Sequence, residues 1–154
     1  QTISLKINGE NVTATVTQAF MYKSQSIDRQ TLFIEAENDN YKFNLKLIDE
    51  YNSNDNSFSN GDYDFANVYS SLDYSEFFIY HKVSGQTNLY HYPDNSLYNV
   101  NFCDGVANKI SATFSAYLTS VDGEDITVDG VLVPYIIEIT EGQFNNIEYT
   151  VTEI

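Results

Sequence analysis

Apolar and polar residues alternate with a period of two along most of the chain, which is the pattern of strands that bury one face. The first two alternating runs, 3–7 and 12–16, flank Asn8-Gly9, a pair typical of a two-residue hairpin turn. No segment has the 3.6-residue repeat of an amphipathic helix. The same alternation returns in runs at 32–36, 41–47, 77–83 and 110–118.

The last third of the chain continues the pattern. Runs at 133–140 and 144–151 lie on either side of Glu141-Gly142, which we interpret as a turn, and Asp129-Gly130 is a turn signal before them. Many short strands joined by turns predict an all-β protein, an antiparallel two-sheet sandwich or flattened barrel of about ten strands. A length of 154 residues suits one domain that spans 1–154.

Charge and the absence of motifs exclude several function classes. With 22 acidic and 7 basic side chains the net charge is -15, the wrong sign for holding nucleic acid. No stretch without charged residues reaches the roughly 20 positions of a membrane-spanning helix. The sequence contains no nucleophile elbow, zinc-protease helix or phosphate-binding loop. We therefore expect no enzyme, no catalytic residue and no cofactor.

Two metal sites were weighed and neither is favoured. The segment 49–64 holds eight Asp or Asn in sixteen positions, but its spacing departs from the EF-hand loop, so a solvated acidic loop is preferred over a calcium site. His81, His91 and Asp94 would make a three-ligand set if a hairpin brought them together. Paired histidines on adjacent strands are more often ordinary residues, and we assign no metal ligand.

The single cysteine and the first residue are the sequence features that concern the cellular compartment of the protein. Cys103 has no partner for an intramolecular disulfide, and its apolar strand favours a small buried side chain over a catalytic thiol. The sequence starts at Gln1, and its one methionine is Met21. Either a removed leader or an arbitrary boundary accounts for this start.

Aromatic residues concentrate in the middle of the chain. Twelve of the 23 Tyr and Phe residues lie in 58–102. A hairpin of 77–83 and 89–92 places Tyr80, Tyr90 and Tyr92 on one face, where rings with polar tips suit the faces and hydroxyls of a sugar. The alternative is that these tyrosines are structural, because tyrosine has high β propensity.

Two segments near the end of the chain resemble a known family. The stretch 104–118 (DGVANKISATFSAYL) and the stretch 139–149 (ITEGQFNNIEY) are similar to the C-terminal signature of small, uncharacterised secreted or lipid-anchored β-sandwich proteins from Bacteroidetes. That signature is an Asp turn, an I-S-G-T-F-S strand and I-T-x-G-x-F, and Ala112 stands here where the family usually has Gly. The resemblance implies an extracytoplasmic protein at the outer membrane or cell surface, anchored by a lipid upstream of Gln1.

The functional expectation combines these observations. We expect an extracytoplasmic, lipid-anchored, non-enzymatic binding or interaction module whose partner is a glycan or another envelope protein. The alternative is a carbohydrate-binding or carbohydrate-active protein of a glycan-uptake system. The candidate ligand-binding residues are Tyr80, Tyr90 and Tyr92.

Overall fold

The computed structural model describes residues 1–65, 74–83, 86–90 and 92–154, with no side chains described for 86–90 and 92. The protein is all-β, as predicted, with 72% of its residues in strands and no helix among the described residues. None of these residues therefore forms a helix long and apolar enough to cross a membrane. The strands are β1 (Thr2–Ile7), β2 (Glu10–Ser24), β3 (Arg29–Glu37), β4 (Tyr41–Asp49), β5 (Gly61–Asp64), β6 (Tyr74–Val83), β7 (Gln86–Tyr90), β8 (Tyr92–Asp104), β9 (Lys109–Thr119), β10 (Ile126–Val128), β11 (Val131–Val133), β12 (Ile136–Glu148) and β13 (Thr150–Glu153).

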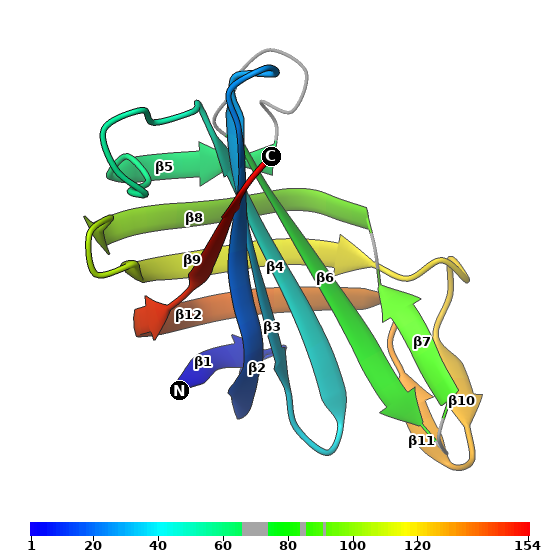
Figure 1. Ribbon diagram of the computed structural model, residues 1–154. Coiled ribbons are helices and arrows are strands. Elements are labelled where there is room, and N and C mark those ends of the chain that lie inside the picture. The colour runs from blue at the N-terminus through cyan, green and yellow to red at the C-terminus, as the bar shows by residue number, and fades with distance from the viewer. Residues whose placement is uncertain (66–73, 84–85, 91) are drawn as a thin grey trace.

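One continuous sheet holds eleven of the described strands (Figure 1). Its order is β5-β8-β9-β12-β1-β2-β3-β4-β6-β7, and neighbours along this path are antiparallel. The last strand, β13, joins β2 in parallel. The hairpin β10-β11 forms a small second sheet.

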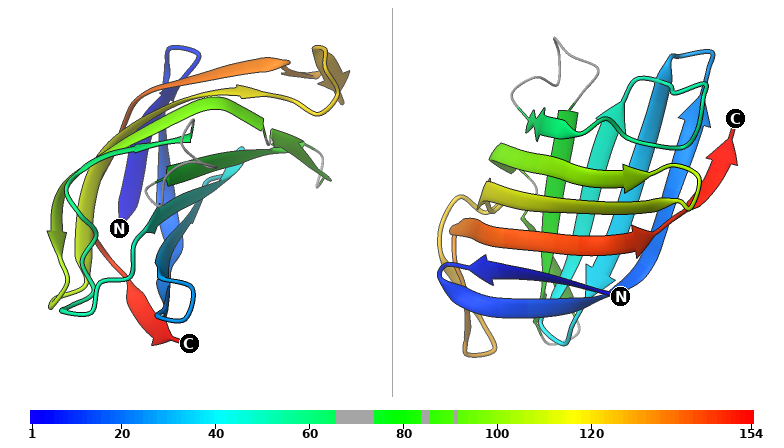
Figure 2. Two further views of the ribbon diagram at one scale, coloured as in Figure 1. Left: turned by 90° about the horizontal axis from the view of Figure 1, so that it is seen from above. Right: turned by 90° about the vertical axis from the view of Figure 1, so that its left-hand side faces the viewer.

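The long strand β2 makes the sheet turn back on itself. Its first half pairs with β1, and its second half, from Thr15 onward, pairs with β3. The register shifts between Val16 and Gln18, and such a β-bulge bends and twists a strand. The sheet consequently curls into a half-barrel, in which β8, β9 and β12 cross over β3, β4 and β6 (Figure 2). The predicted two-sheet sandwich is not confirmed, because pairing continues through the bend.

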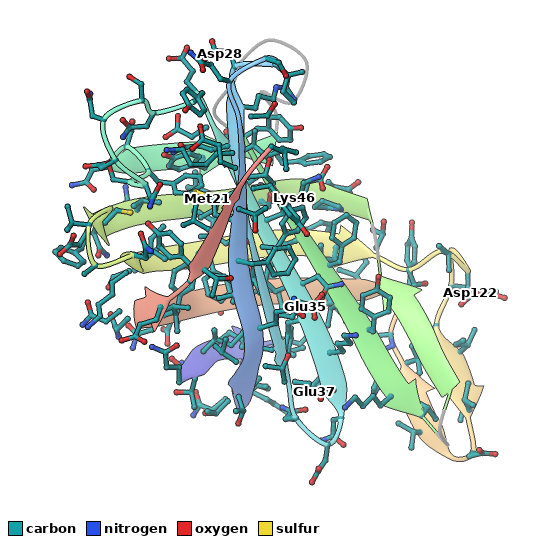
Figure 3. The ribbon with its side chains drawn as sticks, viewed as in Figure 1. Met21, Asp28, Glu35, Glu37, Lys46 and Asp122 are labelled. Carbon is teal, nitrogen blue, oxygen red and sulfur yellow. The ribbon has the colours of Figure 1, made fainter. Side chains whose placement is uncertain are left out.

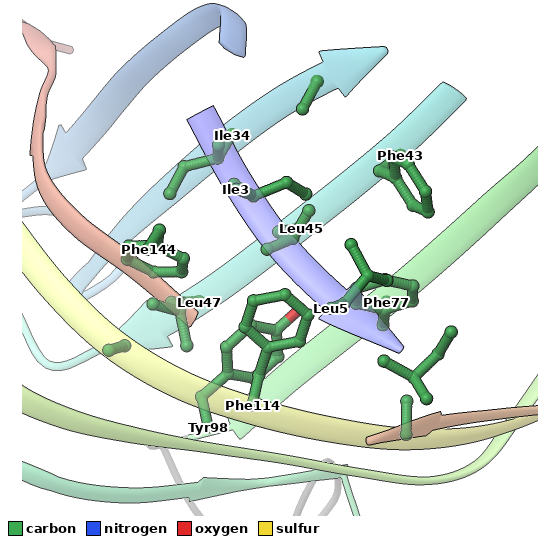
Figure 4. Packing of buried hydrophobic residues seen from close by; sticks show 14 of the residues in the cluster. Ile3, Leu5, Ile34, Phe43, Leu45, Leu47, Phe77, Tyr98, Phe114 and Phe144 are labelled. Carbon is green, nitrogen blue, oxygen red and sulfur yellow. The ribbon is translucent and has the colours of Figure 1, made fainter. Parts of the chain in front are cut away.

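The core fills the inside of this curl (Figure 4). Phe114 of β9 lies at its centre, with the rings of Phe77 and Tyr98 at centroid distances of 5.6 Å and the ring of Phe144 at 6.1 Å. These four side chains are buried and come from four strands. Each buried ring of this size contributes about 1.5–3 kcal/mol relative to an exposed one. The cluster therefore joins both arms of the sheet.

Turn predictions succeeded where both residues adopt the left-handed conformation. Asn8 (φ 48°) and Gly9 (φ 84°) form the predicted turn between β1 and β2, and Asp129-Gly130 connects β10 to β11. The turn predicted at Glu141-Gly142 is wrong, since β12 runs straight through it from Ile136 to Glu148. Glu141 has a φ of 48°, and the register with β9 shifts there, so this pair forms a β-bulge.

Candidate binding site

A groove of about 570 Å³ lies on the outer face of β2, β3, β4 and β6. This volume is within the roughly 300–1,000 Å³ that is usual for small-molecule sites. The rings that line the groove are Phe20, Phe33, Phe78 and Tyr80. Its polar side chains are Glu35, Asn44, Lys46 and Glu76.

Strand register explains why these side chains meet. Residues directly opposite each other in an antiparallel pair share one face of the sheet. Phe33 of β3 lies opposite Lys46 of β4, and Asn44 of β4 lies opposite Phe78 of β6. With about 4.8 Å between neighbouring strands, β3 and β6 are roughly 10 Å apart. The two rings therefore stand on either side of β4, which supplies the polar floor.

Three aromatic rings pack together at the β2 side of the groove. Phe20 stacks on Phe33 with a centroid distance of 5.1 Å and an interplanar angle of 21°. The ring of Tyr22 meets both edge-on, at 5.3 and 6.1 Å. Tyr22 is 44% exposed, and the two phenylalanines are only partly buried. An apolar platform thus faces solvent on a sheet face that also carries charged residues.

The floor of the groove is polar and incompletely satisfied. Lys46 Nζ lies 3.2 Å from Glu76 Oε2 and 5.7 Å from the centroid of the Phe33 ring. Figure 3 labels Glu35 and Lys46 on this face. Asn44 Oδ1 is buried and accepts no hydrogen bond from any described residue. An unsatisfied buried acceptor costs about 1–3 kcal/mol, so a ligand hydroxyl that donates to Asn44 would recover that free energy.

Of the three tyrosines predicted to bind ligand, Tyr80 lines the groove. The side chains of Tyr90 and Tyr92 lie outside the part of the structure that is described. The backbone forms the expected β6-β7 hairpin, but its register pairs Tyr80 with Leu89 and Ile79 with Tyr90. Tyr92 begins β8 and pairs with Thr119 of β9.

The sequence interpretation missed the other rings of the groove. Phe20, Phe33 and Phe78 each stand at an outward position, next to an inward-facing Ala19, Leu32 or Phe77 in the alternating pattern. Alternation predicts polar residues at these outward positions, and the aromatic residues found there instead are a local sequence signal of an exposed apolar surface.

The acidic loop between β4 and β5 is built around an internal cation. Lys23 of β2 is 4% exposed, and its ammonium donates to the backbone oxygens of Asn52 at 2.7 Å and Asp55 at 2.8 Å and to Asn56 Oδ1 at 3.2 Å. Hydrogen bonds from Ser57 lower the pKa of the Asp55 carboxyl. These three loop oxygens, which could otherwise bind a cation such as calcium, thus accept hydrogen bonds from Lys23.

The structure describes two members of the histidine metal set, His81 and Asp94. No group of three or more His, Cys, Asp and Glu side chains in that part of the chain is placed to hold a metal ion. His91 lies outside the described residues, and Asp94 is exposed on β8. His81 faces inward, its ring 4.9 Å from that of Tyr41, and burial lowers its pKa.

Cys103 is partly buried near the end of β8. Its sulfur accepts a hydrogen bond from the Phe58 backbone N–H at 3.2 Å and lies 3.5 Å from the Tyr149 hydroxyl. Burial raises the pKa of the thiol, which disfavours the reactive thiolate. This environment is that of a packing residue.

Comparison with known proteins gives no further identification. The chain matches no protein-family model, no curated protein and no solved structure. The resemblance to the Bacteroidetes proteins therefore remains a prediction, and the groove is the best-supported candidate site.

Proposed function

We propose that the protein is a non-enzymatic module that binds carbohydrate in the groove over β2, β3, β4 and β6. The observation that carries this proposal is the combination of partly exposed rings with a buried oxygen on Asn44 that accepts no hydrogen bond from the described residues. A sugar ring has an apolar face that packs on aromatic side chains and hydroxyls at its rim that donate and accept hydrogen bonds.

The polar floor favours a sugar over an acyl chain. A lipid tail in the groove would bury Asn44 and the Lys46–Glu76 ion pair without giving them hydrogen-bond partners. Sugar hydroxyls supply such partners, and Glu35 offers a further acceptor. The location that fits this function is extracytoplasmic, at the outer membrane or cell surface, as the resemblance implies.

Replacing Phe33 tests the aromatic platform. Phe33→Ala should weaken oligosaccharide binding by about 0.5–1.5 kcal/mol, because it removes one ring contact from the ligand. Isothermal titration against a broad oligosaccharide panel measures the loss. The control is Tyr117→Ala, which removes an exposed ring on β9, outside the groove, and should leave binding unchanged.

Two results would contradict the proposal. One is an absence of binding by the parent protein across the panel, and the other is an equal loss from Phe33→Ala and Tyr117→Ala. Release of shorter sugars from the panel would instead make the protein carbohydrate-active.

Replacing Asn44 distinguishes a role in binding from a role in stability. Because its buried oxygen lacks a donor, Asn44→Val should leave the melting temperature unchanged or raise it. The same substitution should reduce affinity for the sugar, since the bound hydroxyl loses its acceptor. A structural asparagine would behave in reverse, with a lower melting temperature and unchanged affinity.

A further inference from the structure

A second pocket adjoins the groove and shares two residues with it. This pocket has a volume of about 280 Å³, and Phe33 and Lys46 line both. From these residues it extends over the same outer face to Arg29, at the start of β3, and Tyr74, at the start of β6. The two pockets therefore lie side by side on one face of the sheet and meet at Phe33 and Lys46.

The charge of the second pocket is opposite to that of the whole chain. The protein has 22 acidic and 7 basic side chains. Among the described residues that line this pocket are two cations, Arg29 and Lys46, and no Asp or Glu. The neighbouring groove contains Glu35 and Glu76. Lys46 is already paired with Glu76 of the groove, so Arg29 is the cation of this pocket that no described carboxylate pairs.

Arg29 is the one arginine of the chain, and most donors of its guanidinium have no partner among the described residues. It lies over the ring of Tyr74, 5.8 Å from the centroid, and its Nη1 is 3.5 Å from the Tyr74 hydroxyl. No ion pair between described residues includes Arg29. Most other cations are occupied, either in ion pairs (Lys6, Lys46, Lys82 and Lys109) or in the acidic loop (Lys23).

We propose that this pocket binds the carboxylate of an acidic sugar, so that the ligand is an oligosaccharide containing uronic acid. This inference rests on the proposed carbohydrate-binding function. A guanidinium presents a planar fork of donors that matches a carboxylate, and such charge-assisted bonds are stronger than neutral ones. The next sugar unit of the same oligosaccharide would then lie in the groove, against Phe33. The net charge of -15 repels an acidic chain at long range, so recognition depends on this local cationic pocket.

Matched pairs of ligands test the inference. Uronate oligosaccharides of several types and their neutral methyl esters differ in the carboxylate alone. Titration of the parent protein should give tighter binding to the acidic member of at least one pair. Arg29→Gln should weaken binding of that acidic chain about tenfold, the equivalent of one charge-assisted hydrogen bond, and should leave binding of its ester unchanged.

Two further variants serve as controls for Arg29→Gln. Lys109→Gln removes one positive charge from an ion pair on β9 and β12, and should not change the preference for the acidic chain. Arg29→Lys keeps the charge but loses the fork, so it should bind the acidic chain with intermediate affinity even if Arg29→Gln folds poorly.

The outcomes distinguish this inference from the function on which it rests. Equal binding of acids and esters, with no effect of Arg29→Gln or Arg29→Lys, would overturn the acidic-sugar inference and leave the groove as a neutral-sugar site. Failure of every oligosaccharide, acidic or neutral, to bind the parent would overturn both.

Discussion

Single residues show how this acidic chain uses its few cations. Lys23 is buried, and its ammonium binds three oxygens of the loop between β4 and β5. Lys23→Met would keep the aliphatic stem and leave those oxygens without a donor. Hydrogen bonds to a charged group are worth about 1.5–3 kcal/mol each, and the cost of burying the ammonium offsets part of their sum. We therefore expect the free energy of unfolding to fall by about 3 kcal/mol in urea denaturation.

Lys109 provides the comparison for Lys23. It is exposed and forms a 3.5 Å ion pair with Glu148. Surface pairs of this kind contribute less than about 1 kcal/mol, so Lys109→Met should change the free energy of unfolding little. Equal losses from the two variants would show that Lys23 does not organise the loop.

His81 predicts a pH dependence of stability. Burial lowers its pKa from the ordinary value of 6.5, and its Nδ1 has no hydrogen-bond partner among the described side chains. The unfolded chain therefore binds the proton more readily than the folded protein does. The contribution of neutral His81 is complete above pH 6.5 and is lost as the pH falls from there through the lower pKa of the folded state.

His81→Phe isolates this contribution because it keeps a ring beside Tyr41. We expect the parent to lose more free energy of unfolding than the variant between pH 7.5 and 5.5, as measured by urea denaturation. All other residues are the same in the two proteins, so their contributions cancel in the difference. Parallel pH profiles would contradict the prediction.

At the scale of the strand, the bulge in β12 depends on a glycine. A Cβ at Gly142 would contact the ring of Phe114 and lie 2.7 Å from its backbone oxygen. Overpacking of this kind costs about 1–3 kcal/mol, so Gly142→Ala should lower the free energy of unfolding by that amount. Gln143→Ala, one residue away and exposed, should stay within about 0.5 kcal/mol of the parent, and similar losses from both would argue against a packing origin.

The same bulge marks the limit of what strand patterns predict. Alternation identified the strands at both ends of the chain, and Asn8-Gly9 located a hairpin, because these signals are local. Glu141-Gly142 has the composition of a turn, yet pairing of β12 with both β1 and β9 keeps the chain extended there. Neighbouring strands therefore decide between a turn and a bulge.

The groove could be predicted only in part for a related reason. Tyr80 was identified from the density of tyrosines, whereas most of its neighbours in the groove come from β2, β3 and β4, which are distant in sequence. The register that brings Phe33, Asn44 and Phe78 onto one face is a property of the assembled sheet. Local sequence shows which rings face outward and does not show which of them meet.

At the scale of the whole molecule, the curl of the sheet determines where ligands have access. Its inner face is filled by the core around Phe114. Interior space is thus used for packing, and the described grooves lie on outer faces of the sheet. A shallow outer groove suits a flat, hydroxyl-rich ligand better than a large apolar one.

The net charge of -15 gives a prediction for the molecule as a whole. Only seven basic groups are present, and the described residues form four ion pairs, so most carboxylates repel one another without compensation. Raising ionic strength from about 0.01 to 0.15 M shortens the screening length from roughly 30 to 8 Å. Screening of the native state should then raise the melting temperature by a few degrees, equivalent to about 1 kcal/mol.

Calorimetric melts in sodium chloride and in calcium chloride at equal ionic strength separate screening from cation binding. Screening alone predicts nearly equal increases in the two salts, and Lys23 already binds three oxygens of the acidic loop. A much larger increase in calcium chloride would mean that a carboxylate cluster binds the divalent ion. A melting temperature indifferent to both salts would contradict the repulsion argument, since it would require the acidic groups to be compensated within the folded chain.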